Sequence, residues 1–162
     1  MFRESRLHTV CESAHCPNMG QCWAKGVATF MILGDICTRA CRFCAGASGR
    51  PLEVDAEEPR HIAQTIQKMN LRYVVITSVA RDDLPDEGSE HFARTVQEIR
   101  RLTPAVKIEI LIPDFSGREE LLELVMDAAP EVISHNIETV RRLSKSVRPQ
   151  ADYARSLQVL KT

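Results

Sequence analysis

The six cysteines of this chain constrain its fold more than any other feature. All of them lie between Cys11 and Cys44, and the rest of the 162 residues contain none. A disulfide scaffold spreads its cysteines over a whole small domain, and this N-terminus has no apolar secretory signal. Clustered cysteines in a reducing compartment more often bind metal, so we expect metal or cluster ligation, with disulfides as the alternative.

The second group, Cys37, Cys41 and Cys44, has the spacing C-x3-C-x2-C. Three thiolates at this spacing can hold one corner of a cubane cluster and leave the fourth iron without a protein ligand. An open metal position is where chemistry can occur. Arg39 and Arg42 lie between these cysteines and are expected to offset the negative charge of a cluster. The alternative is structural zinc, although zinc sites usually have four ligands.

The first group, Cys11, Cys16 and Cys22, has the spacing C-x4-C-x5-C, which is not a common zinc spacing. It again offers three thiolates, so we expect a second cluster that takes a further ligand from elsewhere. The alternative is that these cysteines are buried or incidental.

The charge balance argues against two classes of protein. Lys and Arg number 21 and Asp and Glu 22, and a nucleic-acid-coating or membrane-surface protein would carry a basic excess. No apolar run approaches the roughly 18 residues that a membrane span needs. We therefore expect a cytoplasmic protein with no nucleic-acid or membrane partner.

Apolar periodicity after the cysteines predicts strands that alternate with helices. The expected strands are residues 29–34, 71–78 (buried on both faces), 106–112 and 131–135; the expected helices are 58–70, 88–102, one opened by a capping box of Ser116 and Glu119, 138–145 and 152–161. This order predicts an α/β fold with a parallel sheet and about four βα units. We expect a cysteine-rich N-terminal extension over residues 1–28 and the βα units over 29–162. His8, His61 and His91 are expected at the surface, and the last strand at an apolar, unpaired edge.

The second cysteine group, with Phe43 as its aromatic, resembles the C-x3-C-x-aromatic-C signature of the radical SAM superfamily. Residues 11–44 resemble the lipoyl synthase family in detail, and so do five further segments: 73–79, 81–84, 112–115, 135–140 and 153–157. The resemblance implies a partial (βα) barrel of radical SAM type, S-adenosylmethionine and two [4Fe-4S] clusters. It implies sulfur insertion at C6 and C8 of an octanoyl group, with the cluster on Cys11, Cys16 and Cys22 as the sulfur donor. The implied partners are a lipoyl carrier protein (H protein or E2 lipoyl domain) and an electron donor such as ferredoxin or flavodoxin.

Polar residues end two of the expected strands. Thr77 and Ser78 end one, and Asn136 and Glu138 follow another. Because sites of parallel barrels lie at the carboxyl ends of the strands, we expect these four residues to bind S-adenosylmethionine. The alternative is that they cap helices or satisfy loop backbone.

The chain departs from the family in one respect. Family members carry an R-S-S-Y motif near the C-terminus, and its serine is the fourth ligand of the auxiliary cluster, but this sequence contains no such motif. We therefore expect a chain truncated before that motif, as a fragment or as one half of a split enzyme. A divergent protein, either another radical SAM enzyme or a non-catalytic iron–sulfur carrier, is the further alternative.

Overall fold

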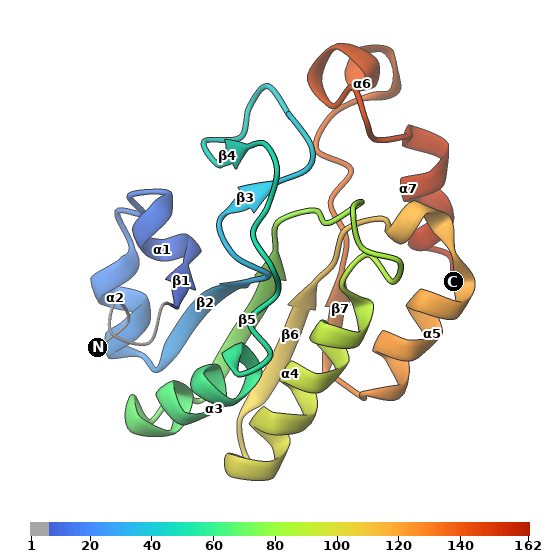
Figure 1. The fold of residues 1–162 in the computed structure, drawn as a ribbon. Coiled ribbons are helices and arrows are strands. Elements are labelled where there is room, and N and C mark those ends of the chain that lie inside the picture. Colours follow the sequence, from blue (N-terminus) through green and yellow to red (C-terminus); the bar gives the residue numbers. More distant parts are fainter. Residues whose placement is uncertain (1–6) are drawn as a thin grey trace.

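A computed structural model describes residues 7–162 and contains a five-stranded sheet at its centre (Figure 1). The strands follow the order β1 (His8–Thr9), β2 (Val27–Ile32), β5 (Tyr73–Ser78), β6 (Lys107–Leu111) and β7 (Val132–Ser134). The last four are parallel to one another, which confirms the expected parallel α/β fold. β1 pairs antiparallel with β2 and was not predicted, because a two-residue strand has no detectable period. The boundary expected between residues 28 and 29 lies inside β2.

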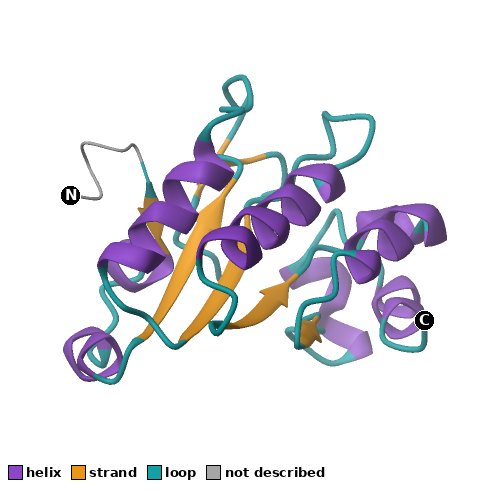
Figure 2. Ribbon diagram, turned by 90° about the horizontal axis from the view of Figure 1, so that it is seen from below, coloured by secondary structure: helices purple, strands orange, loops and turns teal. Residues whose placement is uncertain are grey.

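Each central strand alternates between a fully buried and a half-buried face. Phe30 in β2, Ile76 in β5 and Ile110 in β6 are each 0% exposed. The expectation that residues 71–78 are buried on both faces is wrong, because Val75 and Thr77 are only half-buried. The helices α3 (Glu58–Lys68), α4 (Ser89–Leu102) and α5 (Glu119–Asp127) pack along one face of the sheet, which explains the difference (Figures 1 and 2).

The sheet-covering helices bury apolar stripes that follow the helical period. Ile62 and Ile66 of α3 and Phe92 and Val96 of α4 are all fully or almost fully buried. Side chains of this size stabilise a fold by about 1.5–3 kcal/mol each when fully buried. These contacts form one continuous core between the helices and the sheet.

Shorter elements lie beside the sheet and at its carboxyl edge. They are α1 (Val10–Ser13), α2 (Met19–Ala24), β3 (Ile36–Cys37), β4 (Ala47–Ser48), the 3₁₀ turn η1 (Phe115–Gly117), α6 (Arg141–Val147) and α7 (Tyr153–Val159). The first two helices pack against β2, whereas the β3–β4 pair and α6 lie beyond the carboxyl ends of the parallel strands (Figure 1). Among the described residues, no helix combines the length and the apolar character that crossing a membrane requires.

Two local expectations are wrong. Ser116 does not cap α5: it lies in η1 with a positive φ of 52°, and the N-cap residue of α5 is Arg118. The Asp114 carboxylate instead accepts a hydrogen bond from the Ser116 N–H at 3.4 Å. Asp114 is therefore the N-cap of η1, the turn that precedes α5. His91 is not at the surface but 5% exposed, and its Nε2 lies 2.7 Å from Glu58 Oε2. A polar residue next to the apolar stripe of α4 is buried here because α3 supplies a partner.

Candidate functional site

The loop that carries Cys37, Cys41 and Cys44 lies over the carboxyl end of the sheet. β2 ends at Ile32, and the chain then turns through Leu33 and Gly34, which have φ values of 68° and 86°. β3 and β4 close the base of the loop as a short parallel pair, and the Gly49 N–H donates to the Cys37 carbonyl at 2.9 Å. The loop is therefore a closed excursion from the first parallel strand.

Backbone N–H groups donate hydrogen bonds to two of the three sulfurs of the loop. Cys37 Sγ accepts hydrogen bonds from the N–H groups of Ala80 at 3.3 Å and Arg39 at 3.4 Å. Cys44 Sγ accepts one from Gly46 at 3.3 Å. Hydrogen bonds of this kind tune the potential of iron-bound thiolates, so the loop already carries contacts that suit a cluster.

Cys41 lies between the other two cysteines of the loop and near Arg148. Burial raises the pKa of the Cys41 thiol, the nearby Cys37 and Cys44 raise it further, and Arg148 opposes them. A bound metal deprotonates a coordinating thiol outright and so reverses this preference. The three sulfurs are thus close enough to influence one another, and a cation among them would stabilise all three as thiolates.

A cavity of about 160 Å³ opens beside this loop. It brings together two of the cysteines and all four of the polar strand-end residues expected at the site: Cys37, Cys41, Thr77, Ser78, Asn136 and Glu138. These residues come from the cysteine loop, the end of β5 and the segment after β7. The parallel register explains their meeting, because the carboxyl ends of neighbouring parallel strands lie at one edge of the sheet.

The four polar residues are not equally free to bind a ligand. Thr77 Oγ1 donates to the Leu111 carbonyl at 3.0 Å, so its hydroxyl already has a partner. Ser78 Oγ is buried and has no hydrogen-bond partner among the described residues. Glu138 has a positive φ of 67°, a strained conformation for a residue with a Cβ. A buried unpaired hydroxyl and a strained carboxylate residue in one cavity are features of a binding site.

The first cysteine group lies in the segment of the short helices α1 and α2, which pack against β2. Cys11 is in α1 and buried, Cys16 is in the following loop, and Cys22 is in α2. All six cysteines are free rather than paired in disulfides. In residues 7–162, no three His, Cys, Asp or Glu side chains stand ready as a metal site. Each cysteine group is therefore gathered on one segment without its sulfurs being preassembled around a metal.

Comparison with known proteins assigns the chain to a family. The family model of the radical SAM superfamily matches residues 31–162. The chain belongs to the radical SAM superfamily. The match includes the loop of Cys37, Cys41 and Cys44 and every element that lines the cavity, and membership of the superfamily implies an iron–sulfur cluster and S-adenosylmethionine.

The resemblance to lipoyl synthases is confirmed. This radical SAM chain is 60% identical over 156 residues to the lipoyl synthase of Phocaeicola vulgatus, which covers 96% of the chain and 55% of that protein. It is 57% identical over 160 residues to the lipoyl synthase of Caldanaerobacter subterraneus subsp. tengcongensis, which covers 99% of the chain and 56% of that protein. The chain thus spans about half the length of the curated relatives that it matches.

A solved structure supports the radical SAM fold independently. The crystal structure of methylornithine synthase is similar over 83% of this chain and 40% of its own, with a TM-score of 0.61 and 15% sequence identity. At this identity the likeness concerns the fold alone. The expected partial (βα) barrel of radical SAM type, with a cysteine-rich N-terminal region, is confirmed.

Sequence reasoning missed Arg148, which lines the cavity and is 9% exposed. Its Nη1 donates to the carbonyls of Asn136 and Ile137 at 3.0 Å each. The guanidinium thus holds the backbone of the segment that carries two of the expected site residues. An arginine just after a short polar helix is normally exposed, and no local pattern in the sequence distinguished this one.

His135 also lines the cavity and was not selected from the sequence. Its Nδ1 faces the Ile112 carbonyl at 2.9 Å, and its Nε2 lies 3.0 Å from Ser156 Oγ of α7. Burial lowers the pKa of His135, although the bond to Ile112 opposes this effect. The imidazole is therefore neutral at pH 7, with the proton assigned to Nδ1, and it joins the end of β7 to α7.

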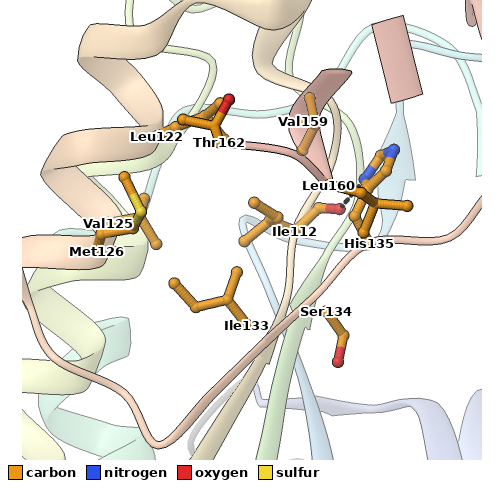
Figure 3. Close-up of a pocket in the computed structure, with 10 residues that line it drawn as sticks. All are labelled: Ile112, Leu122, Val125, Met126, Ile133, Ser134, His135, Val159, Leu160 and Thr162. Carbon is orange, nitrogen blue, oxygen red and sulfur yellow. Dashed lines mark hydrogen bonds between the residues drawn. The ribbon is translucent and has the colours of Figure 1, made fainter. Parts of the chain in front are cut away.

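A second cavity, of about 180 Å³, lies on the other side of His135 and is mostly apolar (Figure 3). Its walls come from α5, β7 and the C-terminal residues, with Ile112, Val125 and Ile133 among them. β7 forms an edge of the described sheet, and its Val132 and Ile133 are 41% and 39% exposed. The expectation of an apolar edge at this strand is confirmed.

Proposed function

We propose that this chain carries the radical SAM part of a lipoyl synthase, which inserts sulfur at C6 and C8 of an octanoyl group on a lipoyl carrier protein. The observation that carries the proposal is the cavity in which Cys37 and Cys41 meet the polar ends of two strands. The identity of 57–60% to lipoyl synthases along almost the whole chain supports the choice of this reaction.

The residues of the second cysteine group share one task in this proposal. Cys37, Cys41 and Cys44 would hold a [4Fe-4S] cluster beside the cavity that Cys37 and Cys41 line. When bound, the cluster and S-adenosylmethionine supply a carbon radical that removes hydrogen from an unactivated C–H bond. Such a bond offers no proton that an acid or base can move, so the chemistry belongs to the cofactor and the positioning to the protein.

The polar residues of the cavity bind and orient S-adenosylmethionine. The unpaired Ser78 hydroxyl offers a hydrogen bond in the buried wall, and the Glu138 carboxylate accepts from hydroxyl or ammonium groups. Asn136 supplies a side-chain amide in the same cavity. Thr77 forms part of the cavity wall without offering a free hydroxyl, because its Oγ1 already donates to Leu111. His135 stays neutral at pH 7 and adds no positive charge beside the positively charged sulfonium of S-adenosylmethionine.

Cys11, Cys16 and Cys22 would hold the second [4Fe-4S] cluster, which would supply the inserted sulfurs. The partners that we propose are an octanoylated H protein or E2 lipoyl domain and a reductant such as ferredoxin or flavodoxin. A cytoplasmic setting suits both oxygen-sensitive clusters and six free thiols.

The test starts with iron and sulfide content after anaerobic reconstitution of this chain. Cubane clusters on both cysteine groups give about eight irons per chain, and a cluster on the second group alone gives about four. Formation of 5′-deoxyadenosine from S-adenosylmethionine then reports the first half of the reaction, and sulfur insertion into an octanoylated carrier reports the second. A chain that binds iron but never cleaves S-adenosylmethionine is an iron–sulfur carrier and contradicts the proposal.

A further inference from the structure

We infer that Arg39 is a positioning residue for the cysteine loop, and that it acts through paired hydrogen bonds to Asp82 and Asp114 rather than as a counter-charge for a cluster. The inference depends on the proposed function only in that the loop of Cys37, Cys41 and Cys44 holds iron. It replaces the expectation, drawn from position alone, that Arg39 offsets the charge of the cluster.

The Arg39 side chain points away from solvent and is 7% exposed. Its Nε lies 3.0 and 2.9 Å from the two carboxylate oxygens of Asp82, and its Nη2 lies 2.7 Å from Asp114 Oδ1. The two carboxylates follow β5 and β6, so one guanidinium joins the cysteine loop to the ends of two strands. The planar fork of arginine makes this geometry possible, and a lysine ammonium does not reproduce it.

Other groups hold both carboxylates in place. Asp114 is 0% exposed, and its Oδ2 accepts a hydrogen bond from Arg155 Nη1 of α7 at 3.3 Å. Asp82 Oδ2 lies 2.8 Å from the Thr38 hydroxyl. Burial alone would raise the pKa of each carboxyl, but Arg39 keeps both pKa values below the usual range. Arg39 is therefore fixed between two charged partners that do not move freely.

A continuous path of hydrogen bonds leads from this network to the sulfur of Cys37. The Thr38 N–H donates to the Ala80 carbonyl at 3.0 Å, and the Ala80 N–H donates to Cys37 Sγ at 3.3 Å. The Arg39 N–H is the second donor to the same sulfur. The positions of both donors depend on where Arg39 and its neighbour Thr38 are held.

The charges of the network cancel within it. Arg39 and Arg155 are positive, and Asp82 and Asp114 are negative, so the group as a whole is neutral. Arg42 is exposed in the same loop, where water screens its charge, and it takes no part in this network, so the inference also sets aside the expectation that Arg42 offsets the charge of a cluster. Mutation of Arg42 also removes a positive charge within two residues of a cysteine of the loop. Arg42→Met therefore serves as the control.

The experiment compares Arg39→Lys, Arg39→Met and Arg42→Met in the reconstituted chain. The measurement is the rate at which an iron chelator removes iron, together with the electron paramagnetic resonance spectrum of the reduced cluster. We expect both Arg39 variants to lose iron about 10-fold faster than the unmutated chain, since contacts that orient metal ligands contribute on this scale. Arg42→Met should match the unmutated chain in rate and spectrum.

The opposite pattern overturns the inference. If Arg39→Lys behaves like the unmutated chain while Arg39→Met and Arg42→Met both lose iron faster, Arg39 acts as a counter-charge. Equal rates in every variant show that Arg39 has no role at the loop. If Arg39→Met does not fold, as judged by circular dichroism, Asp82→Asn replaces it, because the Asp82 carboxylate is 36% exposed.

Hydrogen exchange of residues 36–48 in the metal-free chain separates this inference from the proposed function. If the unmutated chain binds no iron, the proposed function fails, and exchange alone decides about Arg39. Faster exchange in both Arg39 variants than in Arg42→Met supports the positioning role. Equal exchange in all three overturns it.

Discussion

The segment that carries Cys11, Cys16 and Cys22 and the loop that carries Cys37, Cys41 and Cys44 have the same number of thiols, but different parts of the chain hold them. Backbone hydrogen bonds between near neighbours organise the first segment, such as the Cys16 N–H to the Cys11 carbonyl at 3.0 Å. The loop instead depends on distant residues, including Asp114, which lies 75 positions from Arg39.

This difference has a consequence for what each segment can do. The first segment takes its hydrogen bonds from near neighbours while α1 and α2 pack against β2, so these hydrogen bonds can rearrange at less cost to the sheet than those of the loop. A loop tied to the ends of β5 and β6 keeps its position as long as these contacts are intact. In the function proposed above, the first segment would hold the cluster that supplies sulfur and the loop would hold the cluster that is retained.

The largest expected effect comes from removing one thiol of each group. Cys37→Ala should abolish S-adenosylmethionine cleavage, because a radical SAM cluster with two thiolate ligands cannot be retained. Cys11→Ala should leave this cleavage intact and abolish sulfur insertion into an octanoylated carrier. Formation of 5′-deoxyadenosine and of the sulfur-containing product measures the two steps. Loss of both activities in Cys11→Ala would refute the division of labour between the groups.

A large effect on stability is expected in η1, next to Asp114. Phe115 is 0% exposed and packs edge-to-face against Phe92, with ring centroids 6.1 Å apart. Phe115→Ala should lower the free energy of unfolding by about 3–5 kcal/mol, since it removes a buried aromatic ring and leaves a cavity. Urea denaturation measures the loss. Leu52→Ala, at a position that is 78% exposed, is the control and should change little.

A smaller effect tests whether the first segment is held locally. Thr9 is the N-cap of α1, and its hydroxyl accepts a hydrogen bond from the Glu12 N–H at 3.2 Å. Thr9→Ala should cost about 1 kcal/mol and speed hydrogen exchange over residues 10–24 while residues 36–48 stay protected. Ser48→Ala, which removes a bond to the Arg39 carbonyl, should give the reverse pattern. Equal changes in both segments after either mutation would end the distinction.

The smallest expected effect is on pH dependence. The pKa of His135 is lower in the folded state than its ordinary value, chiefly because of burial, so the unfolded chain binds the proton more tightly. The contribution of His135 to the free energy of unfolding is therefore fully present above about pH 6.5, the ordinary pKa of histidine. It falls as the pH drops below that value. Denaturation between pH 7.5 and 5 measures the slope, and His135→Asn should reduce it. His15→Asn, at an exposed position in the first cysteine segment, should keep it.

The strand and helix pattern between residues 58 and 112 was predictable from the sequence. α3, β5, α4 and β6 each begin and end within two residues of the expected bounds. Apolar residues at helical or strand spacing carry this information locally, and the tertiary structure agrees with it. The candidate site was partly predictable as well. Once the strands were expected to be parallel, the polar residues at their carboxyl ends had to meet at one edge of the sheet.

The sequence by itself determined the class of fold, the two cysteine groups and the four polar residues that line the cavity. Only the tertiary structure decided that Arg148 lies in that cavity, that His91 is buried against Glu58 and that Arg39 is paired with two carboxylates. The physical reason is that burial of a charged side chain requires a partner, and these partners lie far away in the chain. Local periodicity records which face of an element is apolar, but not which distant charge a buried charge will meet.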